Sequence, residues 1–195
     1  MADKSEMKNS EYKHEYDYKK QKAIKPVIEM LVEQVMEANA KKEFLQFIDY
    51  LKQQKMSVRW FVTNSYNIIF KGCKTAQLYI NEGKDGQNRW QIKINTAQRD
   101  MFDDFLSGLN DDVIELFSNS FDKKKKCTGC GGCAPGKTFD FAGKHYESLC
   151  DGSNGIRIVK YVNPNPKQVE EIKKLIDVRN EFCVKMRAKG IKSAL

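Results

Sequence analysis

The stretch SVRWFVTNSYNIIFKGCKTAQLYIN, residues 57–81, decides the fold class, because its apolar residues recur with a period of two. It holds three β-like runs, at 57–62, 66–70 and 76–81, with turn signals at Thr63-Asn64-Ser65 and Lys71-Gly72. A fourth run, RWQIKI at 89–94, follows the loop EGKDGQN. Short loops between successive strands predict an antiparallel meander.

Helical patterns lie on both sides of these strands. Apolar residues at helical spacing predict two helices, or one long bent helix, from Ile24 to near Gln54, with a break at Asn39. A further helical stretch at 98–118 is expected in two pieces around Ser107-Gly108, the second capped by Asn110 or Asp111.

The C-terminal part combines one more strand with the clearest helix start in the chain. IRIVKYV at 156–162 is strand-like, and the helix after it begins with Asn165 at the N-cap, Pro166 and Gln168. Cys183 lies on the apolar stripe of this helix and is expected to be a core thiol. Together the patterns predict an α+β fold, with a small antiparallel sheet of about four to five strands and flanking helices.

Composition predicts the domain organisation and the compartment. Residues 1–22 are almost entirely polar or charged and are expected to form a mobile tail. Residues 23–195 are expected to form a single domain, into which a cysteine-rich hairpin at 123–151 is inserted. The N-terminus has no apolar signal region and the chain has no apolar run of about 18 residues, so we expect a cytoplasmic protein without a membrane partner.

The segment KKKKCTGCGGCAPGKTFDFAGKHYESLC, residues 123–150, carries the candidate site. Cys127, Cys130 and Cys133 form two overlapping C-x-x-C pairs, whose thiolates can surround one ion. A predicted hairpin, KTFDF-AGK-HYESL, would return Cys150 to the same place. Four thiolates then close a tetrahedral site without an open position, as in structural zinc sites. We therefore expect these four cysteines to bind Zn²⁺.

Two other chemistries fit the same cysteines. A C-x-x-C-x-x-C run suits an iron–sulfur cluster, and any C-x-x-C pair can act as a redox dithiol. His145 is a spare candidate ligand. A lone histidine on a hairpin strand is, however, more often an exposed residue, or one that contacts a metal ligand, than a ligand itself.

The same segment also matches the phosphate-loop pattern GxxxxGKT, from Gly131 to Thr138. That motif requires a buried strand before the loop and a helix after it. Lysines and cysteines precede this copy, and a hairpin pattern follows it. We therefore expect no nucleotide at this segment.

The charge is distributed unevenly. Residues 1–120 hold 18 Lys/Arg and 18 Asp/Glu, whereas residues 121–195 hold 16 and 8, which is the whole net charge of +8. Lys123, Lys124, Lys125 and Lys126 stand next to the cysteines and could offset thiolate charge or contact a polyanion. A nucleic acid or an acidic protein is the candidate partner of residues 121–195.

No arrangement of side chains indicates an enzyme. The two histidines, His14 and His145, have no serine or cysteine nucleophile at a recognisable spacing. The sequence therefore favours a non-catalytic, zinc-stabilised binding protein. The alternative is an iron–sulfur or thiol redox protein.

The module from Arg59-Trp60 to Trp90-Gln91, followed by C-x-G-C-x-x-C-x-P-G-K-T, G-K-x-Y and a last cysteine, carries a resemblance. It resembles small bacterial α+β proteins with a cysteine-rich CxxCxxC hairpin, a domain of unknown function. The resemblance covers about residues 55–185. It implies a fold but no activity, catalytic residue or partner.

Overall fold

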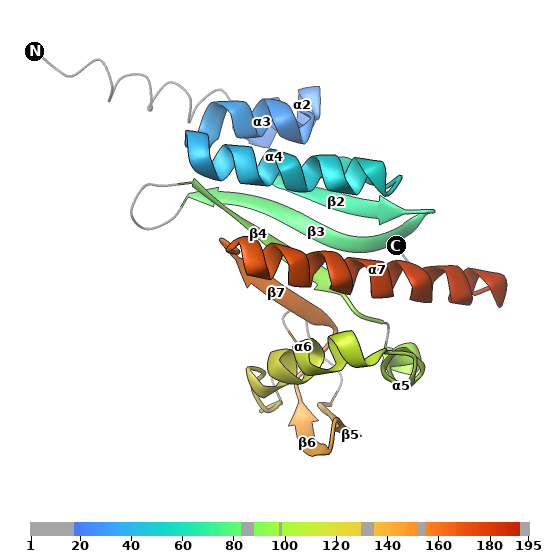
Figure 1. The fold of residues 1–195 in the computed structure, drawn as a ribbon. Coiled ribbons are helices and arrows are strands. Elements are labelled where there is room, and N and C mark those ends of the chain that lie inside the picture. The colour runs from blue at the N-terminus through green and yellow to red at the C-terminus, as the bar shows by residue number, and fades with distance from the viewer. Residues whose placement is uncertain (1–17, 83–87, 98, 130–134, 152–154, 192–195) are drawn as a thin grey trace, which may run out of the picture. The chain divides into compact units, whose positions relative to one another are not determined.

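The computed structural model describes residues 18–82, 88–97, 99–129, 135–151 and 155–191 (Figure 1). Its helices are α2 (Tyr18–Ile24), α3 (Ile28–Val35), α4 (Ala38–Gln53), α5 (Phe102–Ser107), α6 (Asp111–Asp122) and α7 (Pro166–Ala188), with one 3-10 turn, η1 (Arg99–Met101). Its strands are β1 (Ser57–Val62), β2 (Ser65–Phe70), β3 (Cys73–Glu82), β4 (Asn88–Asn95), β5 (Lys137–Phe141), β6 (Lys144–Leu149) and β7 (Ile158–Val162).

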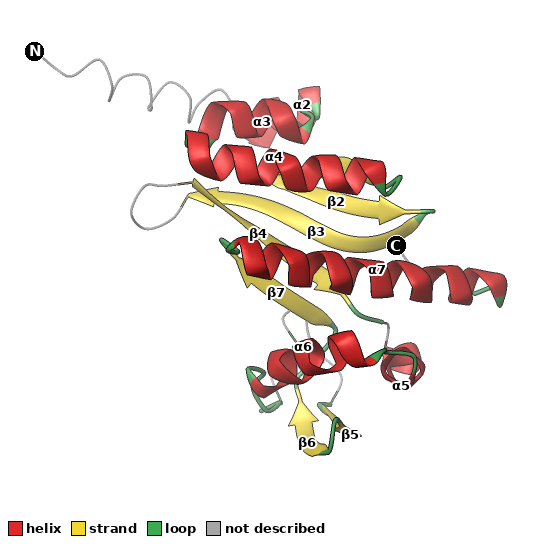
Figure 2. Cartoon of the chain, viewed as in Figure 1, coloured by secondary structure: helices red, strands yellow, loops and turns green. Residues whose placement is uncertain are grey.

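Five strands form one antiparallel sheet in the order β1-β2-β3-β4-β7, and β5 pairs with β6 in a separate two-stranded sheet (Figure 2). The α+β fold and the meander are therefore confirmed. The predicted loop EGKDGQN lies largely outside the described residues, but each of the other three predicted hairpin turns contains residues with positive φ, as tight two-residue turns require. These are Asn64 (φ 55) after β1, Lys71 and Gly72 (φ 45 and 78) after β2, and Ala142 and Gly143 (φ 52 and 72) between β5 and β6.

The chain divides into two compact units that share strands of the sheet. The first comprises Met1–Gly72 and Gln77–Gln91, and the second comprises Cys73–Ala76 and Ile92–Leu195. β3 and β4 each supply residues to both units, so the division passes through the sheet. The expectation of a single domain at 23–195 stays a prediction.

In the first unit, α4 packs its apolar face on the sheet. Phe44, Phe47, Ile48 and Leu51 of this helix are buried. The Trp90 ring of β4 packs edge-on against Phe44 and stacked against Phe47, with ring centres 5.0 and 5.3 Å apart. The helix break lies at Met36-Glu37, not at the predicted Asn39, because Met36 leaves α3 in an extended conformation and buries its side chain.

Residues 18–22 are helical, although their composition predicts that they belong to the charged tail. The cause is Gln21, which is fully buried. Its Nε2 donates to Asn64 Oδ1 at 2.7 Å, and its Oε1 accepts from the Asn64 backbone N–H at 2.8 Å. One amide side chain thus ties α2 to the β1–β2 turn. Residues 1–17 lie outside the described part of the chain.

In the second unit, α7 begins with the predicted capping box. The Gln168 N–H donates to Asn165 Oδ1 at 2.9 Å, and the Asn165 N–H donates to Gln168 Oε1 at 3.0 Å. The buried side of the helix consists of Ile172, Leu175, Ile176, Arg179, Asn180, Phe182, Cys183 and Met186. Thr75 of β3 donates its hydroxyl to Asn180 Oδ1 at 2.9 Å, which fixes this face of α7 against the strand.

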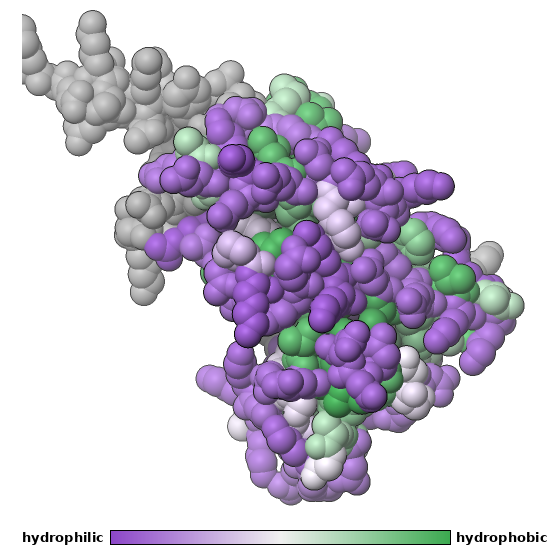
Figure 3. Space-filling model, viewed as in Figure 1, coloured by the Kyte–Doolittle hydropathy of each residue, from purple (hydrophilic) through white to green (hydrophobic). Residues whose placement is uncertain are grey.

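The face of the molecule shown in Figure 3 is mostly hydrophilic, with hydrophobic atoms in small separate areas. Among the helices that the structure describes, none combines the length and the apolar character that crossing a membrane would need.

Replacing Asn165 by alanine should lower the free energy of unfolding by about 1 kcal/mol, because the Gln168 N–H loses the side-chain oxygen that caps it. Asn110→Ala is the matched control, since Asn110 holds the N-cap position of α6 without a side-chain capping bond, contrary to the sequence expectation. Urea denaturation of both variants measures the difference. Equal losses in the two variants would contradict the assigned role of the α7 cap.

Candidate metal centre

The structure brings two of the four candidate cysteines next to each other through backbone pairing. Lys126 and Leu149 form an antiparallel bridge outside the named strands. On either side of it, the Cys127 N–H donates to Ser148 O at 2.7 Å and the Cys150 N–H donates to Lys125 O at 3.1 Å. The segment before Cys127 therefore lies along β6, on the edge opposite to β5.

This register places Cys127 and Cys150 on one face. Side chains alternate along paired strands, so both cysteines lie on the face opposite to the one that carries Lys126 and Leu149. Cys127 is opposite Ser148, which makes Cys150 its diagonal neighbour. Diagonal neighbours have Cα atoms about 7–8 Å apart, a separation that two cysteine side chains can close around one ion.

A β-bulge in β6 determines which of its side chains lie on the face of Cys150 and which are buried. Lys137 pairs with Leu149 but Phe139 pairs with Tyr146, so Glu147 and Ser148 together oppose Thr138 alone. Ser148 has φ 49, in the left-handed region, and its N–H donates to Thr138 Oγ1 at 3.0 Å. The extra residue allows Tyr146 and Leu149, three positions apart, to be buried together.

Gly136 permits the close approach of β5 at the same point. A Cβ on this residue would lie 2.5 Å from Ser148 O. Cys127 and Gly136 thus flank β6 from its two sides. The connection between them contains Cys130 and Cys133, which lie outside the described residues.

An aromatic cluster holds the hairpin on α6. Phe121 of α6 packs edge-on against Phe139, Phe141 and Tyr146, with ring centres 5.3 to 5.7 Å apart. The Tyr146 hydroxyl lies 3.0 Å from Ser118 Oγ and donates to Asp122 Oδ1 at 3.0 Å. The same Asp122 pairs with Lys144 at 2.7 Å, and this contact is the main cause that holds the Asp122 pKa below its ordinary value.

The four lysines before the cysteines have different surroundings. Lys124 donates to Ile158 O at 2.6 Å, and Lys126 pairs with Glu147 at 2.5 Å, whereas Lys123 and Lys125 are exposed. Burial and the charge of Lys160 lower the pKa of Lys124, and a Cys150 thiolate acts in the opposite direction. Lys124 therefore lies close enough to Cys150 to stabilise negative charge on its sulfur.

His145, the spare candidate ligand, lies at the other end of the hairpin from Cys150. His145 Nδ1 is 2.7 Å from Asp140 Oδ1 near the turn of the hairpin, and it is exposed. It lies five positions before Cys150, which along a strand corresponds to roughly 15 Å. Within the described ranges, no three His, Cys, Asp or Glu side chains are grouped so as to hold a metal ion.

The last two residues of the phosphate-loop match belong to the hairpin, and residues 131–134 of the match lie outside the described part of the chain. Lys137 and Thr138 belong to β5, where a phosphate loop requires a helix. Lys137 Nζ donates to Asp103 Oδ2 at 2.8 Å and lies over the Phe102 ring. The Thr138 hydroxyl accepts the Ser148 N–H.

The two other cysteines form a buried pair. Cys183 is a core thiol of α7, as predicted, and it lies in hydrogen-bonding contact with Cys73, the first residue of β3. Burial raises the pKa of the Cys183 thiol to about 12, so this thiol stays protonated at neutral pH. The nearby Arg179 is buried as well, and burial lowers its pKa. No sequence pattern indicated that Cys73 would meet Cys183, because their contact depends on α7 lying across the start of β3.

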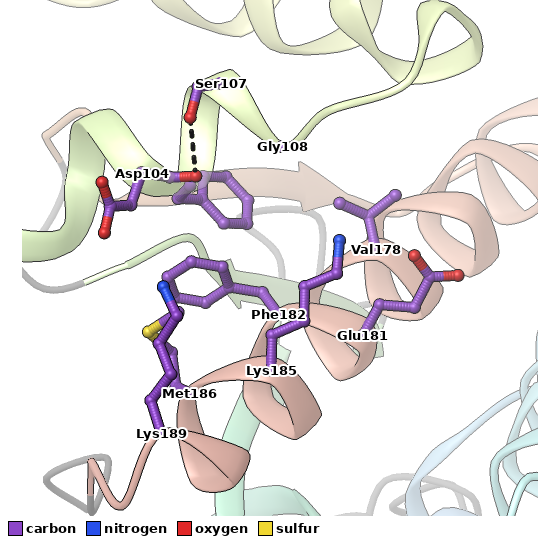
Figure 4. Close-up of a pocket in the computed structure, with 10 residues that line it drawn as sticks. Asp104, Ser107, Gly108, Val178, Glu181, Phe182, Lys185, Met186 and Lys189 are labelled. Atoms are coloured by element: carbon purple, nitrogen blue, oxygen red, sulfur yellow. Dashed lines mark hydrogen bonds between the residues drawn. The ribbon is translucent and has the colours of Figure 1, made fainter.

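A pocket of about 270 Å³ lies between α5 and α7 (Figure 4). Phe105, Phe182 and Met186 give it apolar walls, and Asp104 and Lys189 stand at its edge. The Ser107 hydroxyl donates to Asp104 O at 3.1 Å instead of facing a ligand. No sequence pattern indicated this pocket, because its walls come from helices about 75 residues apart.

No protein-family model, curated protein or solved structure matches the chain. The resemblance to small bacterial α+β proteins with a cysteine-rich hairpin therefore stays a prediction that rests on the motif.

Phe121→Ala should lower the free energy of unfolding by about 3–5 kcal/mol, because it opens a cavity between α6 and the hairpin. Val184→Ala, at a side chain that is 42% exposed on α7, is the control and should change it by less than about 0.5 kcal/mol. Chemical denaturation of both variants checks the difference. A small loss for Phe121→Ala would mean that the hairpin does not depend on the cluster.

Proposed function

We propose that Cys127, Cys130, Cys133 and Cys150 bind one Zn²⁺ and that the chain is a non-catalytic binding protein stabilised by this ion. The observation that carries the proposal is the Lys126–Leu149 bridge, which aligns Cys127 and Cys150 on one face. These two cysteines are 23 positions apart in the sequence. The backbone pairing of the residues beside them supports their use as ligands of one ion.

The surroundings of the two thiols suit thiolate ligands. Both cysteines are half-buried, so their sulfur atoms are partly shielded from water. Lys124 precedes Lys125, whose carbonyl accepts the Cys150 N–H, and an ammonium group near a thiol favours its ionised form. Four thiolates and Zn²⁺ carry a net charge of about −2, which adjacent lysines partly offset.

The residue set supports a structural role for the metal. A site with four cysteine ligands has no open position for a substrate or a water molecule. Residues 128–135 are too few to form a core of their own, and the ion would join them to a hairpin that is already packed on α6. The proposed ion would thus cross-link the segment of Cys130 and Cys133 to the hairpin.

The first test is the metal content of protein purified without oxygen. We expect about one zinc per chain and no visible colour. Iron with a brown chromophore would replace the zinc proposal by an iron–sulfur protein. Metal-free protein in which two of these cysteines form a disulfide would replace it by a thiol redox protein.

The second test compares cysteine variants by zinc content and melting temperature. Cys127→Ser and Cys150→Ser should each lose zinc and melt at a lower temperature, because metal binding and folding are coupled. Cys183→Ala is the matched control, since it removes a buried thiol of the core and should lower the melting temperature while zinc is retained. A site variant that loses zinc but melts like the wild-type protein would refute the structural role.

Cobalt substitution separates loss of a ligand from loss of the fold. Co²⁺ bound by thiolates absorbs visible light, and the intensity rises with the number of sulfur ligands. Wild-type protein should show the spectrum of a tetrahedral four-thiolate site, and Cys150→Ser should show a weaker one at temperatures where the variant remains folded. Identical spectra would exclude Cys150 as a ligand.

A further inference from the structure

Cys73 and Cys183 form a pair of thiols in the core of the second unit, distinct from the four candidate zinc ligands. Their side chains are 0% and 1% exposed and lie in hydrogen-bonding contact. The bond from the Thr75 hydroxyl to Asn180 Oδ1 agrees with this placement. Thr75 follows Cys73 by two positions, on the same face of β3. Asn180 precedes Cys183 by three positions, on the same side of α7. The fold itself therefore places the two thiols side by side.

A buried cation lies beside the pair. Arg179 precedes Cys183 by about one turn of α7 and is 8% exposed. Its guanidinium carbon lies 5.6 Å from the centre of the Phe182 ring, and its Nε has no hydrogen-bond partner among the described residues. In the part of the chain that the structure describes, no carboxylate pairs with Arg179, and the groups that act on its charge are the two thiols. The charge of Arg179 is thus buried next to sulfur.

The charge of Arg179 indicates what could complete this cluster. A buried charge is costly unless an opposite charge lies next to it. Neutral thiols do not supply that charge, and burial keeps the Cys183 thiol protonated at neutral pH because it raises the pKa to about 12. A disulfide is neutral as well, and so is a pair of thiolates bound to a divalent ion. Two thiolates bound to a monovalent ion carry a net charge of −1, which balances one guanidinium group.

We propose that Cys73 and Cys183 bind one Cu(I) ion between their sulfur atoms and that Arg179 balances the charge of this complex. Cu(I) is a soft monovalent ion that prefers thiolate ligands, and two of them can complete its coordination. Zn²⁺ instead requires four ligands, and in the described ranges no third His, Cys, Asp or Glu joins the pair.

Binding of the ion is a proton-releasing exchange. Each thiol gives up its proton to solvent and forms one copper–sulfur bond, and the oxidation states of copper and sulfur do not change. The bound ion would link the start of β3 to α7. This site does not rest on the proposed zinc site.

The test uses full-length protein in which Cys73 and Cys183 are the two remaining cysteines, because the thiols of the hairpin segment would also bind Cu(I). The variant carries four substitutions: Cys127→Ser, Cys130→Ser, Cys133→Ser and Cys150→Ser. Anaerobic titration with Cu(I), in competition with the chromophoric chelator bicinchoninate, measures the stoichiometry and the affinity. We expect about one tightly bound Cu(I) per chain, and none after the further change Cys183→Ala.

The variant Arg179→Gln tests the charge balance in the same two-cysteine protein. It should weaken Cu(I) binding by roughly tenfold to a hundredfold, the usual effect of removing a residue that supports a metal ligand. Lys185→Gln is the matched control, because it removes an equal charge at an exposed position of α7, and it should leave the affinity unchanged. Circular dichroism of each variant before the titration checks that it is folded.

A second measurement does not depend on the folding of the four-serine variant. Wild-type protein and the double variant Cys73→Ala/Cys183→Ala are titrated in the same way, and the double variant should bind about one Cu(I) fewer per chain. Equal numbers of bound ions in these two proteins would refute the site.

Three further results would overturn the proposal. A folded two-cysteine variant that takes up no Cu(I) would exclude the ion. Equal affinities of Arg179→Gln and Lys185→Gln would exclude charge balance by Arg179. A disulfide between Cys73 and Cys183 that forms with oxidised glutathione, in protein that binds no Cu(I) after reduction, would assign the pair to thiol redox chemistry instead.

Discussion

The arrangement of the candidate metal centre depends on the backbone pairing of Leu149. This residue pairs with Lys137 of β5 on one side and with Lys126 on the other. The two pairings bring together segments before and after the cysteine loop, and they bury Leu149 while Cys150 lies on the other face. Side-chain contacts of Phe121 and of the Tyr146 hydroxyl then hold β5, β6 and the segment before Cys127 on α6.

Much of the fold could be predicted from local sequence. The strands, the tight turns and the α7 capping box all depend on residues close together in the chain, and the structure places them as expected. Contacts between distant residues were not predictable. The burial of Gln21 in the β1–β2 turn, the bulge at Ser148 and the pairing of β7 with β4 are of this kind. For the candidate site, the pattern predicted the hairpin that carries Cys150, but only the register shows that Cys127 shares its face.

The bulge at Ser148 determines how β6 would respond to the deletion of one residue. The face on which Cys150 lies depends on the number of residues between it and Tyr146, and the bulge adds one residue to that number. Deleting Glu147 or Ser148 would remove the bulge and leave Leu149 two positions after Tyr146, which is the regular spacing for one face, so Leu149 and Cys150 would keep their faces. The bulge can therefore absorb the loss of one residue, whereas the loss of one residue from a regular part of a strand would exchange its two faces.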